Sequence, residues 1–185
     1  MPYLNSAIKE FQYYKSLGDH CINRLSEEEL NWKANEESNS INIIINHLNG
    51  NMMSRWTDFL NSDGEKDSRN RDQEFEELIK TKAQAKVKWE EGWACLFKAL
   101  ESVNAQKLED IVYIRNIGHT ITEAINRQLC HYSYHIGQMV YLSKMIKSSQ
   151  WGSLSIPKGN SQSYNKKKFS VDKHRGHFTD GFLKQ

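Results

Sequence analysis

The sequence predicts an all-α protein built as a helical bundle. Proline occurs only at positions 2 and 157, so nothing between these positions forbids a helix. Apolar residues recur at spacings of three and four through long segments, which is the pattern of helices that bury one face. The length of 185 residues, with 38% hydrophobic and 26% charged residues, suits one globular domain with a substantial core.

Four long helices are expected along the chain. They are predicted over residues 6–24, 40–60, 72–102 and 122–147. Between the first two, Ser26 and Glu29 have the spacing of a capping box that starts a short helical turn. Gly92 is an internal weak point of the third helix, because glycine costs roughly 1 kcal/mol relative to alanine inside a helix. The fourth helix begins near Thr122.

Two segments depart from the helical pattern. The β-prone residues 112–115, a turn at 116–118 and residues 119–121 predict a short β-hairpin before the last helix. From Gly152 onward the periodicity is lost. We therefore expect a bundle over residues 1–151 and an irregular tail over 152–185, partly packed on the bundle and partly flexible.

The charge of the chain is unevenly placed. The tail carries seven Lys and Arg residues against two Asp residues, or +5, whereas the remaining residues carry −3. A basic tail can contact nucleic acid. The slightly acidic body argues against nucleic acid as the main ligand. We interpret Lys166, Lys167 and Lys168 as a solvated charge run.

Several classes of protein are excluded by what the sequence lacks. No apolar run approaches the ~20 residues that span a bilayer, and residues 1–5 lack the pattern of a signal peptide. We therefore expect no membrane partner and a cytoplasmic location. GxSxG, Walker and GxGxxG motifs are absent. Cys21, Cys95 and Cys130 are interpreted as reduced, mostly buried thiols rather than as a disulfide framework.

The most informative residues are histidines. His131 and His135 lie four apart, and therefore on one face of the last helix. His47 lies on the second helix. Three imidazoles in a bundle can bind a divalent metal and leave coordination positions open for water or substrate. A single HxxxH pair is weak support, since most such pairs are surface or core histidines. His20 and His119 show no partner in the sequence, whereas His174 and His177 in the basic tail are a weaker alternative pair of metal ligands.

Polar residues accompany the histidines on both helices. Asn51 and Arg55 follow His47 at helical spacing, and Arg127 and Gln138 flank the histidine pair of the last helix. We take these four as candidate catalytic residues. Arg55 or Arg127 would orient an anionic substrate, while Asn51 or Gln138 would bind substrate or water. Arg55 and Asp58 are alternatively a plain local ion pair.

Seven segments together resemble the DinB-like (YfiT-like) superfamily of metalloenzymes, in one of its uncharacterised branches. The similarity spans roughly residues 5–165. The segments are His47–Met52, Ser54–Leu60, Ser62–Lys66, Trp89–Trp93, Glu123–Gln128, His131–Gln138 and Ser153–Gly159.

The resemblance implies a four-helix bundle with up-down-down-up topology, assembled as a homodimer. It implies that His47, His131 and His135 bind nickel or zinc, with iron or manganese as further candidates. Some members are S-transferases or hydrolases that use a low-molecular-weight thiol. We therefore expect a metal-dependent enzyme of this kind. The alternatives are a non-catalytic, stress-related bundle that binds metal or a small ligand, and a nucleic-acid module acting through the basic tail.

Overall fold

The computed structural model describes residues 2–183, so Lys184 and Gln185 at the end of the predicted tail lie outside the described residues. The protein is mostly helical, with one small antiparallel sheet. No helix among residues 2–183 combines the length and apolarity needed to cross a membrane. The elements are α1 (Tyr3–Arg24), α2 (Glu27–Asn31), α3 (Ile41–Trp56), η1 (Asp72–Phe75), α4 (Lys82–Glu101), η2 (Ala105–Lys107), β1 (Ile111–Ile114), β2 (Ile117–Thr120), α5 (Ile121–Lys147), η3 (Ser148–Gln150), α6 (Ser161–Phe169) and η4 (Phe178–Gly181).

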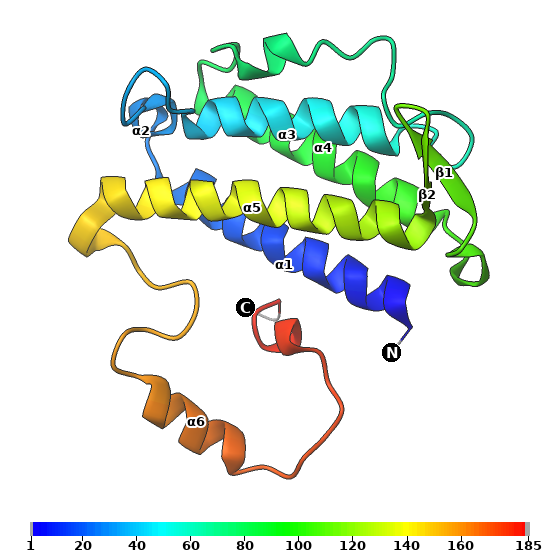
Figure 1. Cartoon of the computed structure of the whole chain (residues 1–185). Coiled ribbons are helices and arrows are strands. Elements are labelled where there is room, and N and C mark those ends of the chain that lie inside the picture. Colours follow the sequence, from blue (N-terminus) through cyan, green and yellow to red (C-terminus); the bar gives the residue numbers. More distant parts are fainter. Residues whose placement is uncertain (1, 184–185) are drawn as a thin grey trace.

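The core lies between the long helices α1, α3, α4 and α5, where α3 packs on α4 and α1 packs on α5 (Figure 1). Each of these helices contributes one large ring to a central cluster. The ring of Phe11 on α1 lies 5.9–6.3 Å from those of Trp56, Trp93 and Tyr132. The Tyr132 hydroxyl accepts from Trp56 Nε1 and donates to Asn51 Oδ1, which satisfies these buried polar groups. The core is thereby joined to a candidate site residue.

The prediction of one helix over residues 72–102 is wrong in its first part. Residues 72–75 form the short 3₁₀ turn η1, and α4 begins only at Lys82. Thr81 caps α4 through a capping box with Gln84, which starts a new helix at this point. Upstream, the Asn46 amide of α3 donates to the carbonyl oxygens of Gln73 and Glu74. Tertiary bonds to α3 therefore replace the helical bonds that the sequence pattern suggested.

The second predicted helix also ends early, at Trp56 rather than at residue 60. Asp58 has φ 47°, which takes the chain out of the helical conformation. The chain then returns along α3, where Ser54 Oγ donates to Gly64 O and accepts from Lys66 N. This connection, residues 57–81, is called the α3–α4 connection below.

The predicted hairpin is confirmed, although its turn lies one residue earlier than expected. β1 and β2 pair antiparallel with Ile114 opposite Ile117. The turn residues Arg115 and Asn116 both have positive φ, as in a type I′ turn. Their N–H groups each donate to Asp63 at 2.8 Å. The hairpin is therefore fastened to the α3–α4 connection.

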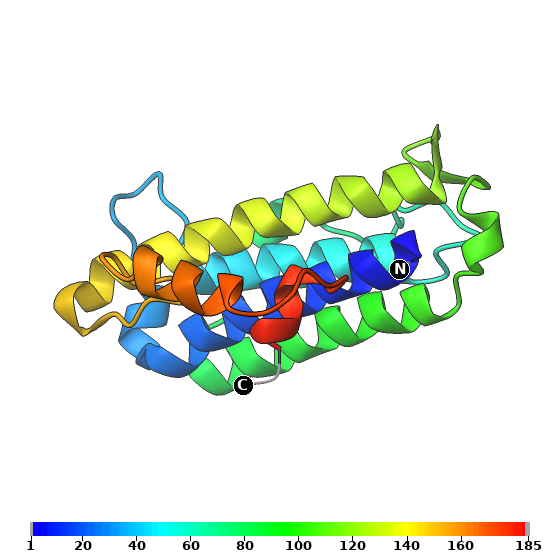
Figure 2. The same ribbon diagram turned by 90° about the horizontal axis from the view of Figure 1, so that it is seen from below.

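The tail is less irregular than predicted, because it contains α6 and η4. No residue of α6 is buried. The following segment returns to α1, where His177 is hydrogen-bonded to Ser6 at 3.0 Å and Asp180 pairs with Lys9. Thr179 is fully buried there. Figure 2 shows this tail crossing one face of the long helices.

Candidate metal centre

The three predicted histidines lie close together between α3 and α5. His131 Nε2 lies 3.2 Å from His47 Nε2 and 3.1 Å from His135 Nε2. All three ligand atoms lie within 4.8 Å of one another. For zinc–nitrogen bonds of about 2.0–2.1 Å, tetrahedral geometry separates the nitrogens by about 3.3 Å. The two short separations are therefore close to those of ligands sharing one ion.

The hydrogen bonds of the rings fix where their lone pairs point. His47 Nδ1 lies 2.8 Å from Glu74 Oε2, which can only accept when ionised, so this Nδ1 carries the proton. His135 Nδ1 donates to Gln138 Oε1 at 2.9 Å. When the rings are neutral, Nε2 of His47 and Nε2 of His135 then each direct a lone pair toward Nε2 of His131. A shared cation satisfies these three nitrogens, so the residues fit a divalent metal of the kind that imidazole binds.

Two of the histidines, His131 and His135, are held in the neutral form that binds metals. Burial, with added repulsion from His135 and His47, lowers the pKa of His131 to about 3. Burial and the neighbouring His47 also lower the pKa of His135 to about 4, against a smaller opposing effect of Gln138. Both rings are therefore uncharged near pH 7, and metal binding there displaces no proton from them.

Glu74 is a site residue that the sequence analysis missed. Its side chain is buried, and it accepts from Arg69 Nε at 2.7 Å and Nη2 at 2.9 Å as well as from His47. Burial raises the pKa of Glu74, but the hydrogen bonds from His47 and Arg69 outweigh it and leave this pKa lowered. A carboxylate on the far nitrogen of a ligand histidine fixes the ring and increases its basicity.

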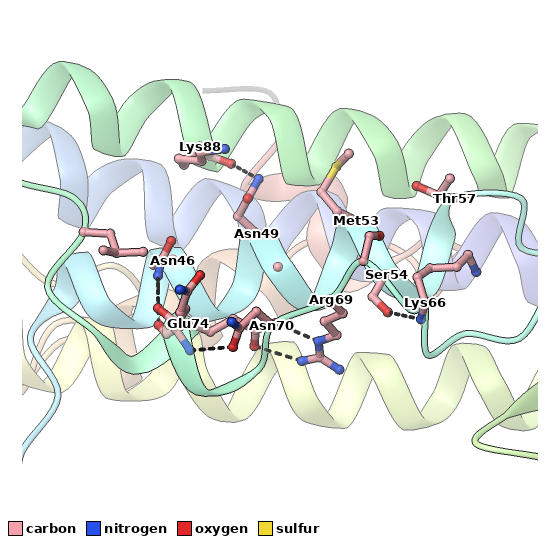
Figure 3. A pocket seen from close by; sticks show the side chains of 14 residues that line it. Asn46, Asn49, Met53, Ser54, Thr57, Lys66, Arg69, Asn70, Glu74 and Lys88 are labelled. Carbon is pink, nitrogen blue, oxygen red and sulfur yellow. Dashed lines mark hydrogen bonds and ion pairs between the residues drawn. The ribbon is translucent and has the colours of Figure 1, made fainter.

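Gly50 on α3 creates the space that Glu74 occupies. A Cβ atom at this position would lie 2.5 Å from Glu74 Oε1, which is too close for a real contact. Figure 3 shows Glu74 and Arg69 side by side against α3, together with Asn46. The cavity drawn there has a volume of about 580 Å³ and is lined by no histidine or cysteine, so it offers no comparable ligand set.

A separate cavity of about 310 Å³ opens at the histidines. Three of the four candidate catalytic residues line it, and Gln138 instead holds His135. The lining comprises His47, Asn51, Arg55, Arg69, Arg71, Phe75, Arg115, Arg127, Gln128, His131 and His135. This volume is at the lower end for ligand sites, so it suits a small molecule.

The alternative interpretation of Arg55, a local ion pair with Asp58, is wrong. Arg55 donates instead to Gly64 O and to Glu65 Oε2, the latter at 2.8 Å. Burial raises the pKa of Glu65, but Arg55 and Arg69 outweigh it and lower this pKa to about 2. Arg115 reaches the same carboxylate at 3.3 Å from the hairpin turn. The α3–α4 connection thus supplies the acids that pair with the buried arginines.

The hairpin also positions Arg127, through a histidine for which the sequence gave no partner. Arg127 Nη1 donates to His119 Nε2 at 3.1 Å, while His119 Nδ1 donates to Ile117 O at 2.9 Å. On the other wall, Phe75 stacks on His47 with ring centroids 4.7 Å apart, and the Arg71 guanidinium lies 5.1 Å from the Phe75 centroid.

The cysteines differ from the expectation of mostly buried thiols. Cys21 is buried, Cys95 is half-buried and Cys130 is exposed. Burial raises the pKa of Cys21 to about 11. Cys130 lies outside the histidine cluster of the described chain, because residues adjacent on a helix point about 100° apart and Cys130 therefore faces away from His131.

Comparison with known proteins identifies a family but no characterised relative. A family model described as "Protein of unknown function (DUF1572)" matches residues 1–160. No curated protein and no solved structure matches the chain. The matched range contains all three histidines and Glu74, and it ends before α6.

Proposed function

Because the chain belongs to the DUF1572 family of proteins of unknown function, we propose its function from the site itself: it is a divalent-metal-dependent enzyme. His47, His131 and His135 bind one ion, with zinc or nickel as the first candidates and iron or manganese next. The convergence of three Nε2 atoms, two of them with Nδ1 already hydrogen-bonded, is the observation that carries this proposal.

We also propose that the long helices form a bundle of the DinB-like type with up-down-down-up topology. The proposal is supported by the packing of α3 on α4 and of α1 on α5. It is also supported by their directions, since α1 and α5 run from right to left in Figure 1 and α3 and α4 run from left to right. In such a bundle, ligands on facing helices build the site.

The reaction we propose is S-transfer from a low-molecular-weight thiol, or hydrolysis. A bound divalent ion would supply Lewis acidity, lowering the pKa of a thiol or water at its open positions. The protein contributes positioning. Arg55 lies at the cavity with its charge held by Glu65, and Asn51 is fixed by the Tyr132 hydroxyl. Gln138 orients His135 rather than touching substrate. The homodimer, the thiol partner and the cytoplasmic location stay predictions.

The experiment that tests this proposal is metal analysis of protein purified without an affinity tag. We expect nearly one zinc or nickel per chain, and a large loss in His47→Ala, His131→Ala and His135→Ala. His20→Ala is the matched control, because His20 is exposed on α1. A parent protein that takes up no metal after exposure to zinc and nickel would contradict the proposal.

A second measurement separates the enzyme from the non-catalytic alternative. The metal-loaded protein is incubated with low-molecular-weight thiols and a panel of electrophiles, and with ester and amide substrates. Turnover that is lost in His131→Ala supports the enzyme. Metal that raises the melting temperature without any turnover supports a metal-binding protein instead, since a native-state ligand stabilises the fold.

A further inference from the structure

We infer that the histidine cavity takes a small molecule carrying an anionic oxygen group, a carboxylate or a phosphate, which binds at Arg71 and Arg127. This inference rests on the proposed function and names its substrate class. It comes from the arrangement of charge around the cavity and from two buried polar atoms that have no hydrogen-bond partner among the residues that the structure describes.

The cavity has an excess of positive charge. Five arginines line it: Arg55, Arg69, Arg71, Arg115 and Arg127. Among residues 2–183, two carboxylates pair with them, Glu65 and Glu74, and these serve Arg55, Arg69 and Arg115. Five guanidinium groups against two carboxylates leave three positive charges, before any metal is counted. Such a site attracts an anion.

The two remaining arginines of the cavity, Arg71 and Arg127, are free to bind an anion. Arg127 donates to the ring of His119, and Arg71 lies over the ring of Phe75. Within residues 2–183 neither forms an ion pair with a carboxylate. Both side chains belong to exposed residues, yet each is held in place by an aromatic partner. Guanidinium groups bind carboxylates and phosphates through two parallel hydrogen bonds, so an anionic oxygen group fits them.

Unpartnered atoms at the same cavity point independently to a ligand. Arg55 Nε and Gln128 Oε1 are buried and have no hydrogen-bond partner in the described part of the chain, in residues that are 5% and 3% exposed. Buried polar groups in folded proteins are normally paired. One atom is a donor and the other an acceptor. A ligand oxygen would satisfy Arg55 Nε, and a hydroxyl or amine of the same ligand would satisfy Gln128 Oε1.

Calorimetric titration of the full chain tests the inference, with and without bound zinc and at low ionic strength. The probes are butyrate and methyl phosphate, with uncharged methyl butyrate as the control ligand. We expect at least one anion to bind and methyl butyrate not to bind. The tighter anion identifies the group. Arg71→Gln and Arg127→Gln should each weaken its binding at least tenfold, whereas Arg175→Gln, an exposed tail arginine, should leave it unchanged.

The role of Gln128 has a matched pair of probes. 3-Hydroxybutyrate adds one hydroxyl to butyrate and should bind several-fold more tightly to the parent protein. In Gln128→Met, which keeps a side chain of similar size, this advantage should disappear. Equal affinities of the two acids for the parent protein would overturn the assignment of Gln128.

The outcomes also separate this inference from the proposed function. Zinc that binds without either anion binding overturns the inference and leaves the metal site intact. Anion binding that Arg71→Gln and Arg127→Gln do not weaken overturns it as well. Anion binding by a protein that takes up no metal supports the inference and contradicts the proposed function.

Discussion

Replacing Glu74 with glutamine tests whether the α3–α4 connection builds the histidine site. Glu74 accepts from His47 Nδ1 at 2.8 Å and from Arg69 at 2.7 and 2.9 Å. Glutamine has nearly the same shape but no charge, and its amide offers one acceptor in place of two. At least one of the donors on His47 and Arg69 then faces an N–H₂ group.

The expected magnitudes follow from these contacts. Loss of the carboxylate behind a ligand histidine typically lowers metal affinity 10–100-fold. Breaking a buried ion pair costs about 3–5 kcal/mol. Because Arg69 keeps its contact with Glu65 at 2.9 Å, we expect a smaller loss of about 2–3 kcal/mol. For a chain of this size, that corresponds to a melting temperature lower by about 4–12 °C.

Two assays measure these effects. Competition with a chromophoric chelator gives the zinc affinity, and thermal unfolding followed by circular dichroism gives the stability of the metal-free protein. Glu76→Gln is the matched control, because Glu76 is exposed two residues away and its side chain has no hydrogen bond to the site. We expect the control to match the parent in both assays.

Two results would refute this reasoning. If Glu74→Gln bound zinc as tightly as Glu76→Gln while unfolding at a lower temperature, Glu74 would serve the fold and not the histidines. Unchanged values in both assays would show that the buried network around His47 does not form in solution.

Three further perturbations test other parts of the structure. Gly50→Ala should push Glu74 away from α3 and weaken zinc binding. The matched control is Gly137→Ala, where the added Cβ meets open space, and it should stabilise α5 by up to about 1 kcal/mol in thermal unfolding. Folding lowers the pKa of Glu65 from 4.5 to about 2, so the ionised carboxylate stabilises the fold by at most about 3 kcal/mol. This stabilisation is present above pH 4.5 and is lost as the pH falls toward 2. Urea unfolding from pH 6 to 2 should show the loss, and Glu65→Gln should remove this part of the pH dependence. Tyr132→Phe should cost about 1–3 kcal/mol, because it leaves two buried polar groups unpaired; a loss below 0.5 kcal/mol would contradict the hydrogen bonds of its hydroxyl.

The parts of the fold that periodicity predicts are those whose contacts are local. The long helices carry apolar stripes at helical spacing, and the hairpin carries turn residues between β-prone runs, so both were recognisable. The pair His131 and His135 was recognisable for the same reason, because i, i+4 spacing alone puts both rings on one face. The prediction that His47 joins this pair required only that the helix carrying His47 face the helix carrying His131 and His135.

The rest depended on contacts distant in sequence. Glu74 and Phe75 lie in a stretch that reads as the start of a helix, yet Asn46 of α3 donates hydrogen bonds to the carbonyl oxygens of Gln73 and Glu74 there. No spacing rule connects residue 74 with residue 47. The only available signal was chemical, since a ligand histidine requires an acceptor on its other nitrogen. That requirement states that a partner exists but does not say which carboxylate supplies it.

The ion pairs around the cavity are better explained by their positioning of site residues than by stabilisation of the fold. Replacing a buried ion-pair network with apolar residues of similar volume is often neutral or stabilising, so burying Arg55 and Arg69 gives the fold no clear advantage. The same network brings Glu74 to the far nitrogen of His47 and holds Arg55 at the cavity. Connections longer than about 12–15 residues without a long helix or strand are usually functional or disordered. The α3–α4 connection is ordered by its bonds to α3 and to the hairpin, and the side chains that it delivers are those that surround the histidines.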